Sequence, residues 1–188
     1  GENDPVVISG GGPVAMVLSL ALYLAGVPFI ALETLHEPFM DQRAASYHPP
    51  TIEMLEGLGL TDKIIPEGLK SPLYRFHDRV TRDVVAEFDL GDLRNELKFP
   101  YVLQYEQYKL VRKILALFGD RADFDVRFSH TVTGFTQFDG HVDVTIQRAD
   151  GTTEFIRGSY LVGCDGGRSV VRKEAEIKFV GFTYPEKF

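Results

Sequence analysis

The hydrophobic pattern at the start of the chain consists of two short apolar runs, separated by a glycine turn and a longer apolar segment. Residues 6–9 are Val-Val-Ile-Ser, residues 10–12 are three glycines, and apolar side chains dominate positions 14–25. The second short run, residues 29–33, is Phe-Ile-Ala-Leu-Glu. Short apolar runs next to glycines are typical of buried strands, and the longer segment favours a helix. The pattern predicts strand, turn, helix and strand, the order of a mononucleotide-binding unit.

The middle of the chain predicts short helices and short strands. The prolines at positions 49 and 50 introduce apolar positions at helical spacing, so a helix is expected from there to about residue 59. A second helix is expected over 106–118, where apolar side chains again recur at helical spacing. Residues 74–77 and 84–88 alternate as two strands, and residues 101–103 form another short strand candidate.

The third part of the chain predicts an antiparallel meander. Residues 131–138, 141–148 and 153–157 alternate as strands, and Asp-Gly pairs at 139–140 and 150–151 separate them. Asp-Gly supplies the positive φ that tight hairpin turns need. A three-stranded meander is therefore expected as an insertion into the strand-helix-strand pattern.

A further strand is predicted after the meander. Residues 160–163, Tyr-Leu-Val-Gly, are expected to form a fully buried strand that ends at the Cys-Asp-Gly-Gly of residues 164–167. Ser169 is the expected N-cap of a following helix. Residues 179–184 resemble a strand that leads into more protein, which predicts that the chain is a fragment. A natural C-terminal edge strand is the alternative.

Composition narrows the class of protein. The 188 residues are 44% hydrophobic and 25% charged, as in an ordinary globular domain. The net charge of −7 argues against non-specific nucleic-acid binding. Residues 14–25 are too short to span a bilayer and follow a glycine turn rather than a basic segment. The single cysteine, Cys164, excludes an intrachain disulfide framework, so a cytoplasmic location is expected. The five histidines lack metal-ligand spacing, and no metal site is expected.

The glycine turn carries the first candidate chemistry. Gly10 allows a sharp turn out of the strand, and Gly12 lets the backbone approach a pyrophosphate. Pro13 suits the first helical turn, and Ala15 allows close packing of helix and strand. Glu33 lies 21 positions after Gly12, near the spacing expected for an acid that binds ribose hydroxyls. A purely structural turn is the alternative, which the register of strand, helix, strand and acid disfavours.

A second acid is expected beside this turn. Ligands of open α/β sheets bind beyond the carboxyl ends of the strands, where Asp165 and Gly166 follow the predicted strand 160–163. Asp165 has oxygens that accept hydrogen bonds from cofactor hydroxyls. A capping aspartate with turn glycines is the alternative.

Three ordered motifs resemble those of a known family. They are the turn 10–15 with Glu33, the loop 43–55 (Arg-Ala-Ala-Ser-Tyr-His-Pro-Pro-Thr-Ile-Glu-Met-Leu), and the Cys-Asp-Gly-Gly-Arg-Ser-Val-Val-Arg of 164–172. Together they resemble single-component FAD-dependent aromatic hydroxylases, such as the p-hydroxybenzoate, phenol and phenylpropionate hydroxylases. The resemblance extends over essentially the whole chain. It implies an α/β, Rossmann-like FAD-binding fold of the glutathione-reductase type, with a parallel sheet and the inserted meander, over residues 1–188.

The resemblance also implies which residues bind FAD. Residues placed around the pyrophosphate are Gly10, Gly12, Pro13, Val14 and Ala15, and Glu33 is placed at the adenosine ribose. Arg43 approaches the phosphates and ribose, which suits the pairing of guanidinium with phosphate, although a surface arginine is the alternative. Gln104 contacts the ribityl or ribose region, the backbone of Val132 meets the adenine ring, and Asp165 and Gly166 serve both FAD and the nicotinamide cofactor. His48 lies in the loop near the flavin, where a helix-leading residue is the simpler interpretation.

The implied activity is hydroxylation of a small phenolic or aromatic substrate, with FAD as cofactor and NAD(P)H as transient reductant. The family's later Gly-Asp motif and its substrate domain do not occur in these 188 residues. The resemblance thus implies an incomplete FAD-binding domain that is inactive alone, and no residue is identified as the base that activates a phenol. Another FAD-dependent reductase or halogenase, a plain NAD-dependent dehydrogenase and a non-catalytic cofactor-binding module are the alternatives, and the meander disfavours the dehydrogenase.

Overall fold

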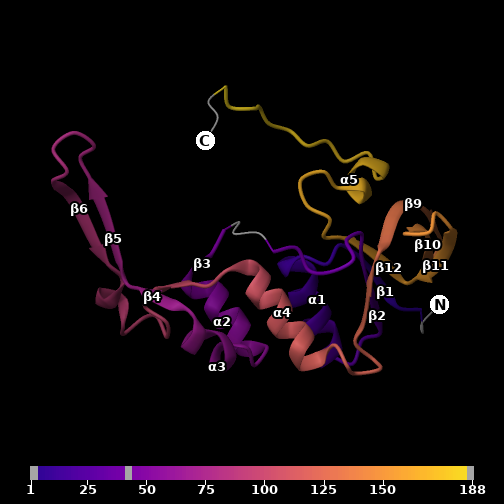
Figure 1. Ribbon diagram of the computed structural model, residues 1–188, viewed down its shortest axis with the longest axis horizontal. Helices are drawn as coiled ribbons and strands as arrows, with labels where there is room; N and C mark the ends of the chain where they lie inside the picture. The colour runs from indigo at the N-terminus through magenta and orange to yellow at the C-terminus, as the bar shows by residue number, and fades with distance from the viewer. Residues whose placement is uncertain (1–3, 41–43, 186–188) are drawn as a thin grey trace. The chain divides into compact units, whose positions relative to one another are not determined.

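A computed structural model describes residues 4–40 and 44–185 of the chain (Figure 1). Contacts within the chain divide it into two compact units. The first unit comprises Gly1–Glu37 and Arg121–Phe188, and the second comprises Pro38–Asp120. Each unit is described by itself.

A four-stranded parallel sheet lies at the centre of the first unit. Its strand order is β12-β1-β2-β8, formed by β1 (Val6–Ser9), β2 (Phe29–Glu33), β8 (Asp125–Phe128) and β12 (Tyr160–Gly163). Strand β1 pairs in parallel with β2 on one side and with β12 on the other. All four residues of β1 are buried, as expected for an inner strand of a parallel sheet. The predicted parallel sheet is confirmed.

Helix α1 (Pro13–Leu24) connects β1 to β2 and begins directly after the glycine turn. Pro13 occupies the first helical position, as the sequence predicted. The buried face of α1 includes Ala15 and Met16, which are both fully buried. The small side chain of Ala15 thus lies where the predicted close packing requires one.

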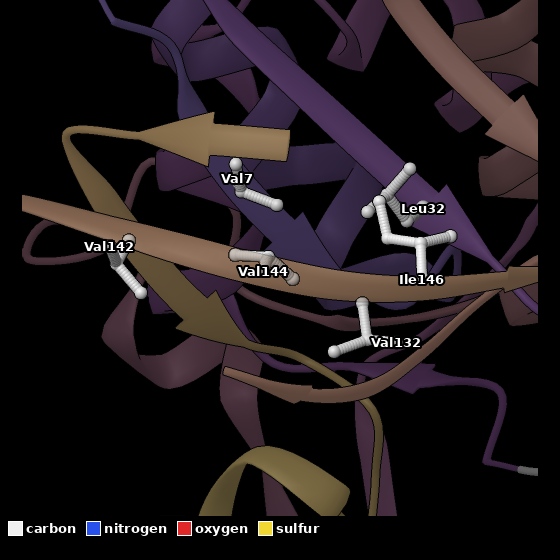
Figure 2. Packing of buried hydrophobic residues seen from close by; sticks show 6 residues of the cluster. All are labelled: Val7, Leu32, Val132, Val142, Val144 and Ile146. Carbon is white, nitrogen blue, oxygen red and sulfur yellow. The ribbon is translucent and has the colours of Figure 1, made fainter. Parts of the chain in front are cut away.

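The meander forms a separate antiparallel sheet in the first unit. Its order is β11-β10-β9, formed by β9 (His130–Phe138), β10 (His141–Arg148) and β11 (Thr153–Gly158). Gly140 and Gly151 adopt positive φ in the two hairpin turns, which confirms the predicted Asp-Gly turns. Apolar side chains of the meander and the parallel sheet form one buried cluster, and Figure 2 shows its members: Val7, Leu32, Val132, Val142, Val144 and Ile146.

Two expectations for the third part of the chain are wrong. Strand β12 is not fully buried, because Leu161 and Val162 are half-buried and the side chain of Tyr160 is 71% exposed. The reason is that β12 is an edge strand, which pairs with β1 alone among the described strands. Residues 179–184 form no strand, because the described chain pairs no strand with them, and Phe182 is exposed. Helix α5 (Val170–Glu174) does begin after Ser169, whose Oγ accepts a hydrogen bond from the amide of Arg172.

The second unit combines short helices with two small sheets. Its three-stranded antiparallel sheet has the order β3-β7-β4, with β3 (Ser46–Tyr47), β4 (Leu69–Ser71) and β7 (Val102–Gln104). The helices are α2 (Pro49–Gly57), α3 (Thr61–Ile64) and α4 (Gln107–Phe118), with 3₁₀ turns η1 (Ile65–Glu67) and η2 (Leu90–Leu93). Strands β5 (Leu73–His77) and β6 (Val84–Asp89) form a two-stranded ribbon. The predicted helices and strands of this region are confirmed.

Close approach of the ends of β1, β2 and β12 fixes the start of the glycine turn. The amide of Gly10 donates to the carbonyl of Leu32 at 2.8 Å, and the amide of Cys164 donates to the carbonyl of Ser9 at 2.8 Å. A Cβ atom on Gly10 would lie 2.4 Å from the carbonyl oxygen of Cys164, and the φ of Gly10 is +117°. Both the contact and the torsion therefore require glycine here.

We expect Gly10→Ala to lower the free energy of unfolding by about 3 kcal/mol or more, because a backbone clash and an unfavourable φ act together. Urea denaturation followed by circular dichroism measures the change. Gly134→Ala is the control, since a Cβ there meets nothing within 4 Å. Equal stabilities of the two variants would contradict the prediction.

Two buried tyrosines in the second unit differ in their hydrogen bonding. The hydroxyl of Tyr105 donates to Oε2 of Glu67 at 3.0 Å. The hydroxyl of Tyr47 is buried and has no hydrogen-bond partner among the described residues. Burial raises the pKa of Tyr47 to about 12, and burial followed by the Glu67 carboxylate raises the pKa of Tyr105 as well. Both phenols are therefore neutral at physiological pH.

The two hydroxyl groups are expected to affect stability in opposite directions. Tyr47→Phe removes a buried polar group without a partner and should leave stability unchanged or raise it by up to about 1 kcal/mol. Tyr105→Phe removes a hydrogen bond and should lower stability by about 1 kcal/mol. Parallel urea denaturation of the two variants makes the comparison, and a larger loss for Tyr47→Phe would refute it.

Candidate cofactor-binding site

The turn between β1 and α1 presents backbone donors at a helix N-terminus. Gly12 is the N-cap residue, and its carbonyl accepts from the amide of Met16 at 3.0 Å. The first-turn amides of a helix lack intrahelical acceptors, and the helix dipole makes this end positive. The first turn of α1 contains no acidic residue that would oppose an anion. The turn therefore has the electrostatics of a phosphate site.

Gly12 is the residue that most directly indicates a ligand. Its φ of −74° suits any amino acid, and a Cβ atom there would meet nothing within 4 Å. Neither backbone strain nor packing within the described chain therefore requires glycine, in contrast to Gly10. The neighbouring Val14 is 68% exposed although it is apolar. An open surface at this position lets a bulky anion approach the backbone, so the turn fits the pyrophosphate of a dinucleotide.

Glu33 is held beside the same turn by two backbone amides. Its Oε2 accepts from the amide of Gly11 at 2.6 Å, and its Oε1 accepts from the amide of Leu35 at 2.9 Å. A Cβ atom on Gly11 would lie 2.7 Å from Cβ of Glu33. Each carboxylate oxygen has a further lone pair for a ribose hydroxyl.

The role of Gly11 was not predicted from the sequence. The third glycine of the turn was a visible signal, but its meaning depends on the pairing of β1 with β2. That pairing brings Glu33 alongside the turn. Gly11 therefore positions the acid that the sequence identified.

Asp165 lies at the end of β12 and caps α5. Its Oδ2 accepts from the amides of Val170 at 2.8 Å and Val171 at 3.3 Å. The capping alternative is therefore present in the structure. Its Oδ1 is buried and has no hydrogen-bond partner among the described residues. An unpartnered carboxylate oxygen at this edge of the sheet leaves an acceptor for a hydroxyl-bearing ligand.

The structure places Asp165 next to the glycine turn, as the sequence predicted. A Cβ on Gly10 would lie 3.2 Å from the amide nitrogen of Asp165. Gly166 adopts a φ of +75°, and a Cβ there would meet nothing within 4 Å. Burial, followed by the charge of Asp165, raises the pKa of the Cys164 thiol, which agrees with an unreactive cysteine.

The remaining predicted site residues, Val132, Gln104 and Arg43, do not belong to the glycine turn or to the strand ends beside it. Val132 is buried in β9 and its side chain belongs to the apolar cluster with Leu32, so only its backbone is available to a ligand (Figure 2). Gln104 ends β7 in the second unit, and its Oε1 accepts from the hydroxyl of Ser46 at 2.9 Å. A cavity of about 520 Å³ beside Gln104 is lined also by Ala45, Glu67, Leu69, Tyr105 and Glu106. Arg43 lies outside the described residues.

A large hollow of the first unit lies apart from the glycine turn. It measures about 1040 Å³ and runs along β12, where Val6, Phe135, Tyr160, Val162, Val171 and Ile177 are among its lining residues. This lining is mostly apolar and includes none of the three turn glycines. The backbone donors of a phosphate site are at the turn and not in this hollow. No helix in residues 4–40 and 44–185 has the length and apolar character needed to cross a membrane.

Comparisons with known proteins identify the family. The chain matches the FAD binding domain family over residues 3–188, and it belongs to this family. FAD is therefore its cofactor, and the predicted Rossmann-like FAD-binding fold is confirmed. The predicted resemblance to FAD-dependent aromatic hydroxylases is confirmed by relatives that bear such names.

Three relatives illustrate the similarity. Para-nitrophenol 4-monooxygenase of Pseudomonas sp. (strain WBC-3) is 29% identical over 184 residues, which cover 98% of this chain and 45% of that protein. The 6-hydroxy-3-succinoylpyridine 3-monooxygenase HspB of Pseudomonas putida is 30% identical over 184 residues. The matched region covers 97% of this chain and 46% of HspB. The crystal structure of p-nitrophenol 4-monooxygenase PnpA from Pseudomonas putida DLL-E4 has a TM-score of 0.91 at 28% identity, covering 96% of this chain and 45% of that one. The chain thus spans less than half the length of these relatives.

We expect Gly12→Ala to weaken FAD binding about tenfold or more while leaving the melting temperature unchanged, because the added methyl group meets only the ligand. Quenching of flavin fluorescence measures the affinity, and circular dichroism measures the melting temperature. Gly57→Ala, which also adds a methyl group in open space, is the control. Unchanged FAD affinity would contradict a role of Gly12 in ligand binding. Destabilisation as large as that of Gly10→Ala would show that Gly12 serves the fold instead.

Proposed function

We propose that this chain is the FAD-binding part of a flavin-dependent monooxygenase that hydroxylates a phenolic or other aromatic substrate, with NAD(P)H as transient reductant. Membership of the FAD-binding family and the names of the relatives support the proposal. The observation that carries the cofactor site is Gly12, because its missing side chain serves no contact within the described chain.

In this proposal the glycine turn binds the pyrophosphate of FAD. The residues that surround it are Gly10, Gly12, Pro13, Val14 and Ala15. The open surface at Gly12 lets the phosphate oxygens approach the first amides of α1, and the positive end of the helix favours their charge. Arg43 adds a guanidinium, whose planar donors suit phosphate.

Glu33 and Asp165 are the proposed hydroxyl acceptors. Glu33 is held by backbone amides of Gly11 and Leu35, so ribose binding requires little reorganisation of the carboxylate. Asp165 keeps α5 capped through Oδ2, while Oδ1, which has no hydrogen-bond partner among the described residues, accepts from a cofactor hydroxyl. Partnering Oδ1 would relieve a desolvation cost of about 1–3 kcal/mol.

The two remaining predicted residues complete the proposed site. Val132 contributes its backbone beside the adenine, since its side chain is committed to the apolar cluster. Gln104 contributes its amide to the ribityl or ribose region, with Ser46 fixing the orientation of that amide. Bound FAD would supply the redox and oxygen chemistry, and these residues would bind and orient the cofactor.

Arg43→Ala tests the phosphate assignment in the chain itself. The variant should bind FAD and ADP more weakly by the same factor, about tenfold, because both ligands share the pyrophosphate. Isothermal titration calorimetry measures both affinities. Arg79→Ala removes an arginine near the turn of the β5–β6 ribbon and should change neither. Unchanged affinities in Arg43→Ala would make Arg43 a surface arginine.

The proposed activity is tested in the complete protein that carries this domain. Supplied with FAD, dioxygen and NADH or NADPH, it should consume the reductant faster when a phenol is present and release a hydroxylated product, detected by mass spectrometry. Reductant consumption without hydroxylation would favour the reductase alternative. Failure to take up FAD would refute the proposed function as a whole.

A further inference from the structure

A polar group of side chains continues the apolar face of the meander, and the cofactor site described above uses none of them. Ile146 of β10 pairs with Val132 of β9 and with Glu154 of β11, so these three side chains share one face. His130 precedes Val132 by two positions, and Arg148 follows Ile146 by two, which places both on the same face. The face that packs against the parallel sheet is therefore apolar at Val132 and becomes polar at His130.

The carboxylate of Glu154 has one satisfied oxygen and one unsatisfied oxygen. Its Oε2 pairs with the guanidinium of Arg148 at 2.5 Å, and its Oε1 is buried without a hydrogen-bond partner among the described residues. Nε2 of His130 lies 3.9 Å from this Oε1, which is too long for a hydrogen bond. The side chain of His130 is nevertheless only 18% exposed. The short contact of the imidazole is on its other nitrogen.

Nδ1 of His130 closes the turn that leads from β8 into β9. It lies 2.6 Å from the carbonyl oxygen of Phe128, the last residue of β8. A carbonyl oxygen only accepts, so Nδ1 carries the hydrogen. Between these residues, Ser129 has a φ of +58°, a left-handed conformation that is unfavourable for residues other than glycine. The hydrogen bond of the imidazole therefore spans the strained residue of the turn.

The turn 128–130 is also tied to the acid at the end of β2. The amide of Ser129 donates to the carbonyl of Leu35 at 2.8 Å, and the amide of Leu35 donates to Oε1 of Glu33 at 2.9 Å. In the other direction the turn leads into β9, where Val132 lies two positions further on. The turn therefore lies between the proposed ribose contact and the proposed adenine contact.

The strand that enters from this turn has an edge open to a ligand. Among the described strands, β9 pairs with β10 alone, so alternate backbone amides and carbonyls of β9 face away from the meander. Adenine presents an acceptor at N1 and a donor at its 6-amino group, which match a backbone amide and a backbone carbonyl. Hypoxanthine carries a hydrogen on N1 and an oxygen at position 6, so both roles are reversed. Discrimination between the two bases therefore depends on the position of the first residues of β9.

We propose that His130 is a positioning residue for the adenosine end of the cofactor. Its Nδ1–H bond to the Phe128 carbonyl fixes the turn 128–130, which holds Glu33 for the ribose and the backbone of Val132 for the adenine. The inference rests on the proposed function and adds a residue that acts through the backbone. Loss of this bond shifts both contacts together, because the turn is joined to the Glu33 segment on one side and to β9 on the other.

Binding of ADP and IDP to the chain of residues 1–188 tests the inference by isothermal titration calorimetry. The two probes share ribose and pyrophosphate and differ only in the base. The ratio of their affinities therefore reports base recognition and is insensitive to the fraction of folded protein. The parent chain should bind ADP about tenfold more tightly than IDP, because reversed donors and acceptors leave backbone groups unpaired.

Two substitutions separate the two nitrogens of the imidazole. The side-chain amide of asparagine places its nitrogen where Nδ1 lies, whereas that of glutamine reaches the position of Nε2. His130→Asn retains a donor to the Phe128 carbonyl, so its ratio of affinities should stay within about twofold of the parent value. His130→Gln loses this donor and should weaken ADP binding about tenfold, with the preference for ADP over IDP reduced to about threefold or less.

His141→Gln is the matched control in the same meander. Nε2 of His141 lies 3.8 Å from Oδ1 of Asp143, much as Nε2 of His130 lies near Glu154. His141 is the first residue of β10, whereas His130 pairs with the last residue of that strand. The substitution should therefore leave both affinities unchanged. Circular dichroism confirms that each variant is folded.

The outcomes separate this inference from the proposed function. If the parent chain binds FAD and ADP but binds IDP as tightly as ADP, the adenosine assignment is overturned and FAD binding stands. If His130→Gln keeps the parent ratio, or lowers both affinities by one common factor, His130 serves only the stability of the meander and the inference fails. A ratio that falls equally in His130→Asn and His130→Gln also overturns it, because the bond to Phe128 is then not the cause. If the chain binds neither FAD nor ADP, the proposed function fails, and this inference fails with it.

Discussion

The close passage of three strand ends at Ser9 and Gly10 is the constraint on which the first unit depends. The backbone there accepts from Cys164 and donates to Leu32, and its closeness to the Cys164 carbonyl leaves no room for a side chain. Because β2 and β12 flank β1 in parallel, Glu33 at the end of β2 and Asp165 just after β12 lie on opposite sides of one turn. The parallel pairing of these three strands therefore determines the positions of the two acids, Glu33 and Asp165.

The apolar cluster between the parallel sheet and the meander also stabilises the positions of these strand ends. Leu32 directly precedes Glu33 and packs in the same cluster as Val132 and Ile146 of the meander. The meander therefore packs against the end of β2, next to the acid that is the last residue of that strand. The inserted meander thus helps to position a candidate ribose-binding residue, because burial of apolar side chains in one cluster couples the two sheets.

The two acids proposed to bind ligand hydroxyls also have structural hydrogen bonds. Glu33 accepts from the amides of Gly11 and Leu35, and Asp165 accepts from two amides at the start of α5. These bonds hold both carboxylates in place before any ligand arrives, which lowers the entropic cost of binding. A structural role for Asp165 is therefore no argument against a binding role, since only one of its oxygens is used.

The sequence by itself determined the elements whose signals are local. The glycine turn, Pro13 at the start of α1, the Asp-Gly hairpins and the Ser169 cap were all predicted, because backbone torsions and capping depend on neighbouring residues. Only the tertiary structure decided that β12 is an edge strand and that residues 179–184 form no strand. It also decided the contact of Gly11 with Glu33 and the contact of His48 with Tyr74. Each of these depends on which distant segment lies alongside, and strand pairing and side-chain convergence leave no mark in the local pattern.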